Sequence, residues 1–152
     1  MVLVFVKGVM KVTIGEDKVF QPGPNKIFVF GSNYAGIHGA GAAKEALDKY
    51  GARWGWGEGL QGNSYAIPTK NGKLQSLDLD TIAGHVELFL ATAASRPNLE
   101  FFVTKIGCGL AGYSEDDIAP MFKNAPPNCE LPHGWRQEES DDQPKREDST
   151  GT

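Results

Sequence analysis

The chain of 152 residues has little cysteine, no long apolar stretch and no surplus of basic residues. Two cysteines, Cys108 and Cys129, are too few for the disulfide scaffold of a small secreted protein, and they lack the spacing of a metal site. No stretch approaches the ~20 apolar residues that a membrane-spanning helix needs. The N-terminus has no basic leader followed by an apolar run of signal-peptide length. We therefore expect a cytoplasmic protein that uses no metal and no membrane.

The acidic residues are concentrated at one end of the chain. Six acidic and two basic residues between 137 and 152 account for the whole net charge of −4, so residues 1–136 are neutral overall. A neutral body offers no basic surface for the backbone of a nucleic acid, and we expect no such partner. The segment 137–152 contains no aliphatic or aromatic side chain. This composition predicts a disordered acidic tail after a single domain at 1–136.

Apolar runs typical of strands recur along the chain. The runs without polar alternation at Ile27–Phe30 and Phe101–Ile106 are typical of strands covered on both faces. Further strands are expected at Val2–Val6, Lys11–Ile14, Ser64–Thr69 and, near the end, Cys129–Trp135. The glycine-rich segment from Trp54 to Gly62 is predicted to be a loop, in which Trp54 and Trp56 either cover a ligand or shield one edge of the core.

Helical periodicity appears between these strands. Apolar residues repeat at helical spacing from Ala42 to Tyr50, and Gly51 is suited to end that helix. Asp80 is the expected N-cap of a second helix, which ends before Pro97. Ser114 is the expected N-cap of a third, with Asp117 at the capping-box position. Strands that alternate with helices predict a three-layer α/β/α sandwich, with ligands at the carboxyl ends of the strands.

Two glycine-rich turns, each between a strand and a helix, are the most informative features. Glycine lets backbone N–H groups approach a ligand closely, and the start of a helix attracts anions. We predict that both turns contact one phosphate-bearing ligand. The predicted contacts in the first turn are Gly31, Ser32, Asn33, Gly36, Gly39, Ala40 and Gly41, and those in the second turn are Gly107, Cys108, Gly109, Leu110, Ala111, Gly112 and Tyr113.

The second turn leads to a helix whose start is expected to face the same ligand. Glu115, Asp116 and Asp117 in the first turn of that helix suit its dipole but would repel a nearby phosphate. Cys108 is either a nucleophile or a small packing residue. Tyr34 and Tyr113 either stack on a base or pack against the protein.

Asn33 and His38 are the candidate catalytic residues. The Asn33 carboxamide can donate to and accept from a ribose hydroxyl, but asparagine also stabilises turns through its own backbone. The His38 imidazole could act as a general base or simply form hydrogen bonds within the loop. Both interpretations stay open for both residues.

Known nucleotide motifs do not account for these glycines. Gly39–Lys44 places lysine where the dinucleotide fingerprint G-x-G-x-x-G requires its third glycine, and no P-loop motif is present. The sequence therefore gives little support to classical NAD redox chemistry or to a nucleoside triphosphate site.

The two turns together resemble those of macro domains. Phe30–Asn33 followed by Gly36–Ala43 resembles the loop of the deacylating ADP-ribose hydrolases, and Ile106–Tyr113 resembles the diphosphate loop of the family. The resemblance covers about residues 27–122. It implies a mixed sheet between helices and a site for ADP-ribose or a related NAD-derived nucleotide. Asn33 would contact the distal ribose, and Gly107–Gly112 would surround the diphosphate.

Three functions follow as expectations. The first is binding of ADP-ribose or a related nucleotide, with hydrolysis of an ADP-ribosyl bond by an enzyme that needs no cofactor. The second is a non-catalytic nucleotide-binding or sensing module, and the third is a cysteine hydrolase built on Cys108 and His38. Ala111 stands where the family commonly has an aromatic residue over the distal ribose, so a smaller phosphoribosyl compound is a further candidate ligand.

Overall fold

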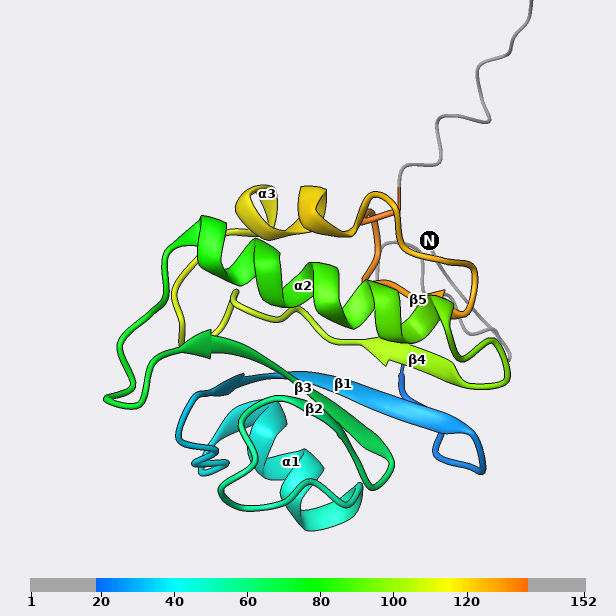
Figure 1. Ribbon diagram of the computed structural model, residues 1–152, viewed down its shortest axis with the longest axis horizontal. Coiled ribbons are helices and arrows are strands. Elements are labelled where there is room, and N and C mark those ends of the chain that lie inside the picture. Colours follow the sequence, from blue (N-terminus) through cyan, green and yellow to red (C-terminus); the bar gives the residue numbers. More distant parts are fainter. Residues whose placement is uncertain (1–18, 137–152) are drawn as a thin grey trace, which may run out of the picture.

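The computed structural model describes residues 19–136, which form a sheet between helices (Figure 1). The strands are β1 (Lys26–Asn33), β2 (Gly59–Gln61), β3 (Ser64–Lys70), β4 (Glu100–Val103) and β5 (Cys129–Glu130). The helices are α1 (Gly41–Lys49), α2 (Leu79–Ala94) and α3 (Glu115–Ile118), and α3 continues into the 3-10 turn η1 (Ala119–Phe122).

The sheet has five strands in the order β2-β3-β1-β4-β5. β3, β1, β4 and β5 run parallel, and β2 pairs antiparallel with β3 at one edge. Helix α1 covers one face of the sheet, while α2 and α3 cover the other (Figure 1). The predicted α/β class and mixed sheet are therefore confirmed.

The central strand β1 explains the long apolar run in the sequence. Ile27 and Val29 pack into the core beneath α2, whereas Phe28 and Phe30 pack into a separate cluster beneath α1. Successive side chains of a strand point to opposite faces, so a strand covered on both sides needs apolar residues at every position.

The two cores differ in size. The core under α2 includes the helix residues Ile82, Val86, Phe89 and Ala93, each with no exposed surface. These residues lie three or four positions apart and form the single buried face that the periodicity predicts. The smaller core under α1 uses alanines from the helix, which let α1 lie close to the sheet.

Several predicted boundaries were wrong. Asp78, not Asp80, caps α2, because its carboxylate accepts a hydrogen bond of 2.9 Å from the Thr81 N–H. The expected loop at Trp54–Gly62 contains strand β2, which pairs with β3 despite its glycine. The expected strand at Cys129–Trp135 is limited to β5, and Trp135 instead lies buried in the core under α2.

The strand expected over Phe101–Ile106 also ends early, at Val103. Thr104 turns the chain at this point, since both its N–H and its hydroxyl donate to the Val29 carbonyl. The capping box of α3 is confirmed, with reciprocal bonds between Ser114 and Asp117.

Some sequence predictions lie outside the described residues. These are the strands at Val2–Val6 and Lys11–Ile14 and the acidic tail at 137–152. Across residues 19–136, no helix combines the length and apolarity needed to cross a membrane.

Candidate functional site

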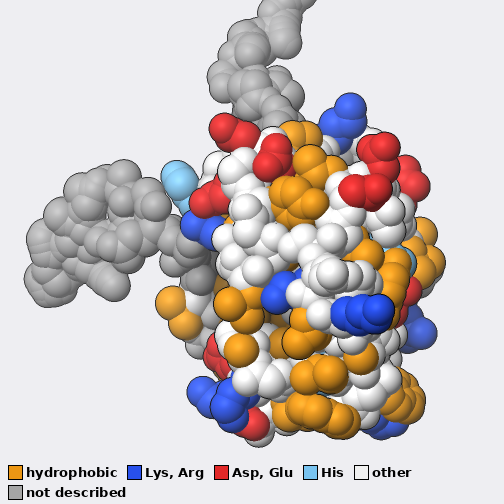
Figure 2. Space-filling view, turned by 90° about the vertical axis from the view of Figure 1, so that its left-hand side faces the viewer, with side chains coloured by type: hydrophobic (Ala, Val, Ile, Leu, Met, Phe, Trp, Pro, Cys, Tyr) orange, Lys and Arg blue, Asp and Glu red, His pale blue; other side chains and the backbone are white. Residues whose placement is uncertain are grey.

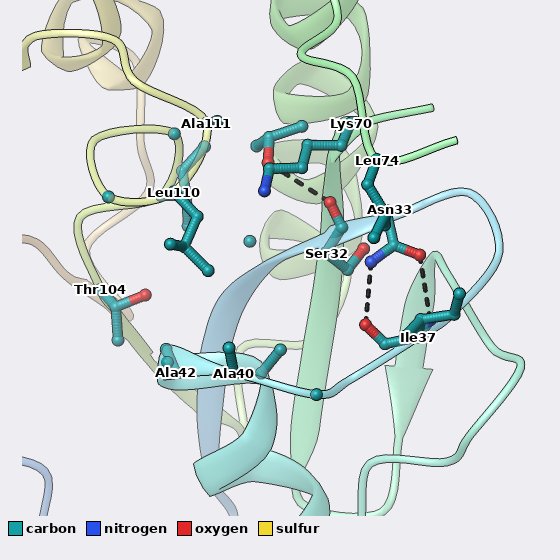
Figure 3. Close-up of a pocket in the computed structure, with 18 of the residues that line it drawn as sticks. Ser32, Asn33, Ile37, Ala40, Ala42, Lys70, Leu74, Thr104, Leu110 and Ala111 are labelled. Carbon is teal, nitrogen blue, oxygen red and sulfur yellow. Dashed lines mark hydrogen bonds between the residues drawn. The ribbon is translucent and has the colours of Figure 1, made fainter. Parts of the chain in front are cut away.

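A cavity of about 470 Å³ opens at the carboxyl ends of β1, β3 and β4. Figure 3 shows its lining, which comes from both glycine-rich turns, the end of β3 and the start of α1. The lining residues are Gly31, Ser32, Asn33, Ile37, Gly39–Ala43, Thr69, Lys70, Leu74, Thr104–Gly107 and Gly109–Ala111. The cavity lies where ligands bind in open α/β sheets.

The two turns adjoin each other, as the sequence predicts. A Cβ atom placed on Gly31 would lie 3.6 Å from the Gly107 nitrogen. The parallel pairing of β1 with β4 brings these strand ends together. Ten of the predicted contact residues line the cavity, namely Gly31, Ser32, Asn33, Gly39, Ala40, Gly41, Gly107, Gly109, Leu110 and Ala111.

The other predicted contacts lie outside the lining. They are Gly36, Cys108, Gly112 and Tyr113, and the candidate catalytic residue His38 also lies outside the lining. The Tyr113 hydroxyl donates to the Leu77 carbonyl at 2.5 Å, which ties the second turn to the segment before α2. Tyr113 therefore packs against the protein.

Asn33 holds the first turn together. Its Nδ2 donates to the Ile37 carbonyl, and its Oδ1 accepts from the Ile37 N–H, each at 2.9 Å (Figure 3). These two bonds are the turn-stabilising role that the sequence left open. The side chain is 7% exposed and still borders the cavity. Each amide atom keeps one further hydrogen-bonding position for a ligand.

Gly36 and His38 pack inside the protein and do not line the cavity. Gly36 has φ +70°, and a Cβ on it would lie 2.3 Å from the Gly55 carbonyl carbon, so only glycine fits. His38 is fully buried, with Nε2 3.2 Å from the Trp56 carbonyl oxygen. Its Nδ1 has no hydrogen-bond partner among the described residues. The imidazole thus lies beside the segment containing Trp56 and away from the cavity.

The second turn leaves its backbone donors available. The N–H groups of Gly109, Leu110 and Ala111 donate to no residue in the described part of the chain. Gly109 faces open space, because a Cβ on it would meet no atom within 4 Å. Gly107 differs: its φ of +77° favours glycine, and a Cβ on it would lie 3.0 Å from Ile118 Cδ1.

The start of α1 also presents free donors to the cavity. Ala40 occupies the N-cap position and provides no side-chain cap, and the first turn contains no acidic residue. The N–H groups of Gly41, Ala42 and Ala43 precede the first intrahelical bond, which Lys44 donates to Ala40. Such groups and the helix dipole favour an anion.

The starts of α2 and α3 are satisfied by their own side chains. Asp78 caps α2, and the Ser114–Asp117 capping box closes α3. The sequence predicted that the helix after Ser114 would face the ligand. In the structure, α1 begins at the cavity, whereas no residue of α3 lines it.

Lys70 was not identified from the sequence. It is the last residue of β3, pairs with Asn33 of β1 and directs its ammonium group into the cavity (Figure 3). It forms no ion pair with any residue between 19 and 136. The parallel pairing of β3 with β1 was the missing information, because it places the end of β3 beside the first turn.

The charges around the cavity are positive. Lys70 and Lys105 line it, and no carboxylate from residues 19–136 does. Glu115, which was expected to repel a phosphate, is engaged by Lys105 Nζ at 3.1 Å and by Trp135 Nε1 at 2.9 Å. Figure 2 shows this end of the molecule, with basic side chains across its middle and acidic ones at its upper edge.

Cys108 lacks the features of a nucleophile. Partial burial raises the pKa of its thiol, and the Glu115 carboxylate raises it further. A nucleophilic cysteine needs the opposite change, a lowered thiol pKa. Together with its place outside the cavity lining, the raised pKa argues against the cysteine hydrolase.

The mouth of the cavity has an apolar rim. Ile37, Leu74 and Leu110 line the cavity and are 37%, 47% and 71% exposed. Trp54 and Trp56 lie outside the lining, and the Arg53 guanidinium stacks 4.6 Å from the centre of the Trp56 ring. Within residues 19–136, no three His, Cys, Asp or Glu side chains come together as metal ligands.

Comparison with known proteins adds no relative: no family model, curated protein or solved structure matches the chain. The resemblance to macro domains therefore remains a prediction from the two turns.

Proposed function

We propose that the cavity binds ADP-ribose or a related phosphate-bearing nucleotide. One observation carries this proposal: the cavity collects hydrogen-bond donors that bond to no other residue in the described part of the chain. They are the N–H groups of Gly109–Ala111, those at the start of α1, and the Lys70 ammonium. A diphosphate offers acceptor oxygens and negative charge to match them.

The apolar rim supports a ligand larger than inorganic phosphate. The exposed side chains of Ile37, Leu74 and Leu110 surround the donors. Burying such side chains against a ribose or a base would add about 25 cal/mol for each Å² removed from water. A nucleotide combines this apolar surface with a charged centre, which suits the cavity better than either part alone.

Binding without hydrolysis is the form of this function that the lining favours. Among the described residues, no histidine, cysteine, aspartate or glutamate lines the cavity, and His38 is buried elsewhere. A general base must come within hydrogen-bond reach of the proton that it removes. An ADP-ribosyl hydrolase would therefore depend on a water held by Asn33 and backbone groups.

Isothermal titration calorimetry with ADP-ribose, AMP and ribose 5-phosphate tests the proposal. We expect ADP-ribose to bind most tightly and Gly109→Val to abolish binding, because the valine occupies the space next to the free amides. Gly84→Val is the matched control: Gly84 lies on α2, outside the cavity, and its Cβ position is also open. Failure of all three compounds to bind, or normal binding by Gly109→Val, would contradict the proposal.

Release assays on ADP-ribosylated protein and on ADP-ribose 1″-phosphate separate the two forms of the function. Binding without turnover identifies a binding module. Turnover that disappears in Asn33→Ala while binding persists would identify a hydrolase.

A further inference from the structure

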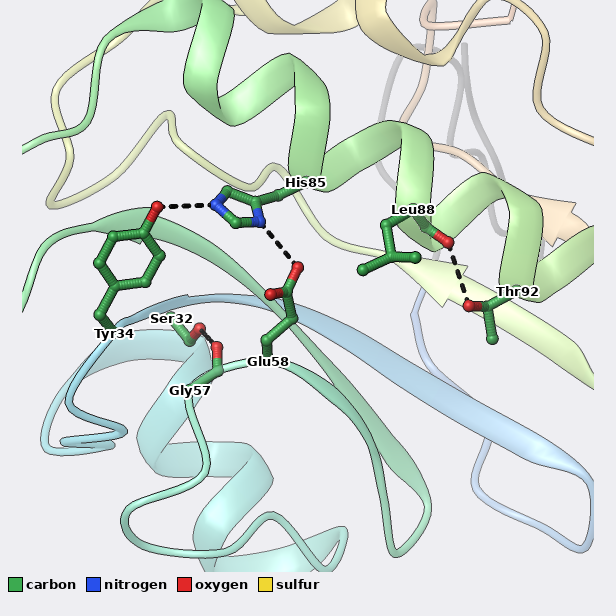
Figure 4. A network of polar contacts seen from close by, with 7 residues as sticks. All are labelled: Ser32, Tyr34, Gly57, Glu58, His85, Leu88 and Thr92. Carbon is green, nitrogen blue, oxygen red and sulfur yellow. Dashed lines mark hydrogen bonds and ion pairs between the residues drawn. The ribbon is translucent and has the colours of Figure 1, made fainter.

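A chain of three polar side chains lies outside the cavity. The Tyr34 hydroxyl is 2.8 Å from His85 Nε2, and His85 Nδ1 is 2.7 Å from Glu58 Oε2 (Figure 4). Tyr34 follows β1, Glu58 precedes β2, and His85 lies on α2. None of the three lines the cavity, so the proposed nucleotide site does not account for them.

The two hydrogen bonds fit one tautomer of a neutral His85 imidazole. A Glu58 carboxylate can only accept, which assigns the proton to His85 Nδ1. In the neutral ring, Nε2 then has a free lone pair and accepts from the Tyr34 hydroxyl. A nucleophile, a base and a group that orients the base thus stand in sequence at hydrogen-bond distances.

The backbone holds Tyr34 in this position. Its N–H donates to the Lys70 carbonyl at 3.0 Å, and Gly57 packs so closely that a Cβ on it would lie 2.9 Å from the Tyr34 carbonyl oxygen. Tyr34 is nevertheless 47% exposed, while the His85 side chain is 19% exposed. The phenol is therefore fixed by the protein and open to a reagent.

We propose that Tyr34, His85 and Glu58 form a nucleophilic triad that accepts an acyl group from an activated acyl donor. The Tyr34 oxygen attacks the acyl carbon as the phenolic proton passes to His85 Nε2. The bond between the acyl carbon and its leaving group breaks, and His85 returns the proton to the leaving group. The product is a tyrosyl ester, with no oxidant or reductant involved.

Acetylation by N-acetylimidazole near neutral pH, followed by peptide mass spectrometry, tests the triad. We expect Tyr34 to be acetylated roughly 100-fold faster than the partly buried Tyr50, since a positioned base contributes about 10²–10⁴-fold. His85→Gln keeps a hydrogen-bonding group but removes the base, and the rate at Tyr34 should fall at least about tenfold. The rate at Tyr50 and the melting temperature report whether the variant is folded.

Two results would overturn the proposal. Equal rates at Tyr34 and Tyr50 in the unaltered protein would overturn the proposal without any variant. A fall of less than about tenfold in the acetylation rate at Tyr34 of His85→Gln would also overturn it. Exposure alone would then explain the reactivity of Tyr34, and the three residues would only connect their segments by hydrogen bonds. If His85→Gln does not fold, Glu58→Gln provides the same comparison, since it removes the charge that orients the ring.

Discussion

The two glycine-rich turns look alike in sequence but are used differently. Asn33–Ile37, the first part of the first turn, is held by internal contacts: Asn33 is bonded twice to Ile37, and Gly36 lies directly against Gly55. In the second turn, three successive N–H groups donate to no residue between 19 and 136, and they lie beside an open space at Gly109. Glycine content alone therefore does not identify a ligand-binding turn. What distinguishes Asn33–Ile37 from Gly109–Ala111 is whether internal hydrogen bonds already hold the segment.

Gly36→Ala should lower the free energy of unfolding most, because it disrupts the packing of the first turn. The alanine would have to adopt φ +70°, and its Cβ would lie 2.3 Å from the Gly55 carbonyl carbon. We expect a loss of roughly 3 kcal/mol or more in the free energy of unfolding, measured by urea denaturation. Gly41→Ala is the matched control, since it has φ +60° but no neighbour within 4 Å, and should cost about 1 kcal/mol. Equal losses would mean that the close approach is unimportant.

Asn33→Ala tests whether the first turn serves the fold or the ligand. Removal of both bonds to Ile37 should lower the free energy of unfolding by roughly 2 kcal/mol in urea denaturation. Unchanged stability combined with a large loss of ADP-ribose affinity would reverse this assignment. The carboxamide would then act on the ligand, as the macro-domain resemblance implies.

Lys70→Gln tests whether the Lys70 ammonium group contributes to binding of the anionic ligand. We expect ADP-ribose to bind about tenfold more weakly in calorimetry, equivalent to about 1.4 kcal/mol, with stability unchanged. The affinity of the unaltered protein should also fall with added salt more steeply than that of the variant. Lys73→Gln is the control, because Lys73 is exposed and outside the cavity lining. Equal affinities for both variants would remove Lys70 from the site.

Ala40→Asp should change the free energy of unfolding only slightly, but it should affect stability and binding in opposite directions. An aspartate at this N-cap position would bond the free N–H groups of α1 and raise the free energy of unfolding by about 0.5–1 kcal/mol. The same carboxylate would compete with a phosphate, so ADP-ribose binding should be lost in calorimetry. A variant that is stabilised yet binds normally would place the anion away from α1.

The sequence predicted the parts of the site that depend on local pattern. The apolar runs identify β1 and β4, the glycines after them identify the two turns, and the capping residues identify α3. The adjacency of the two turns also follows from the chain, because neighbouring parallel strands end at one edge of a sheet.

Other features could not be predicted because they depend on partners distant in sequence. Lys70 enters the cavity through the pairing of β3 with β1. His85 was assigned no role, since its neighbours Tyr34 and Glu58 lie 51 and 27 positions away. His38 stands in the first turn and yet points away from the cavity, because its ring packs edge-on against Phe30 of the core.

The amino-acid sequence by itself determined an α/β chain with two glycine-rich corners, because periodicity and capping act over a few residues. Only the tertiary structure decided which backbone N–H groups border the cavity. It also decided that Lys70 enters the cavity and that Tyr34 and Glu58 bond to His85. Hydrogen-bond satisfaction depends on every segment that packs nearby, so it becomes defined only when the sheet and its helices are assembled.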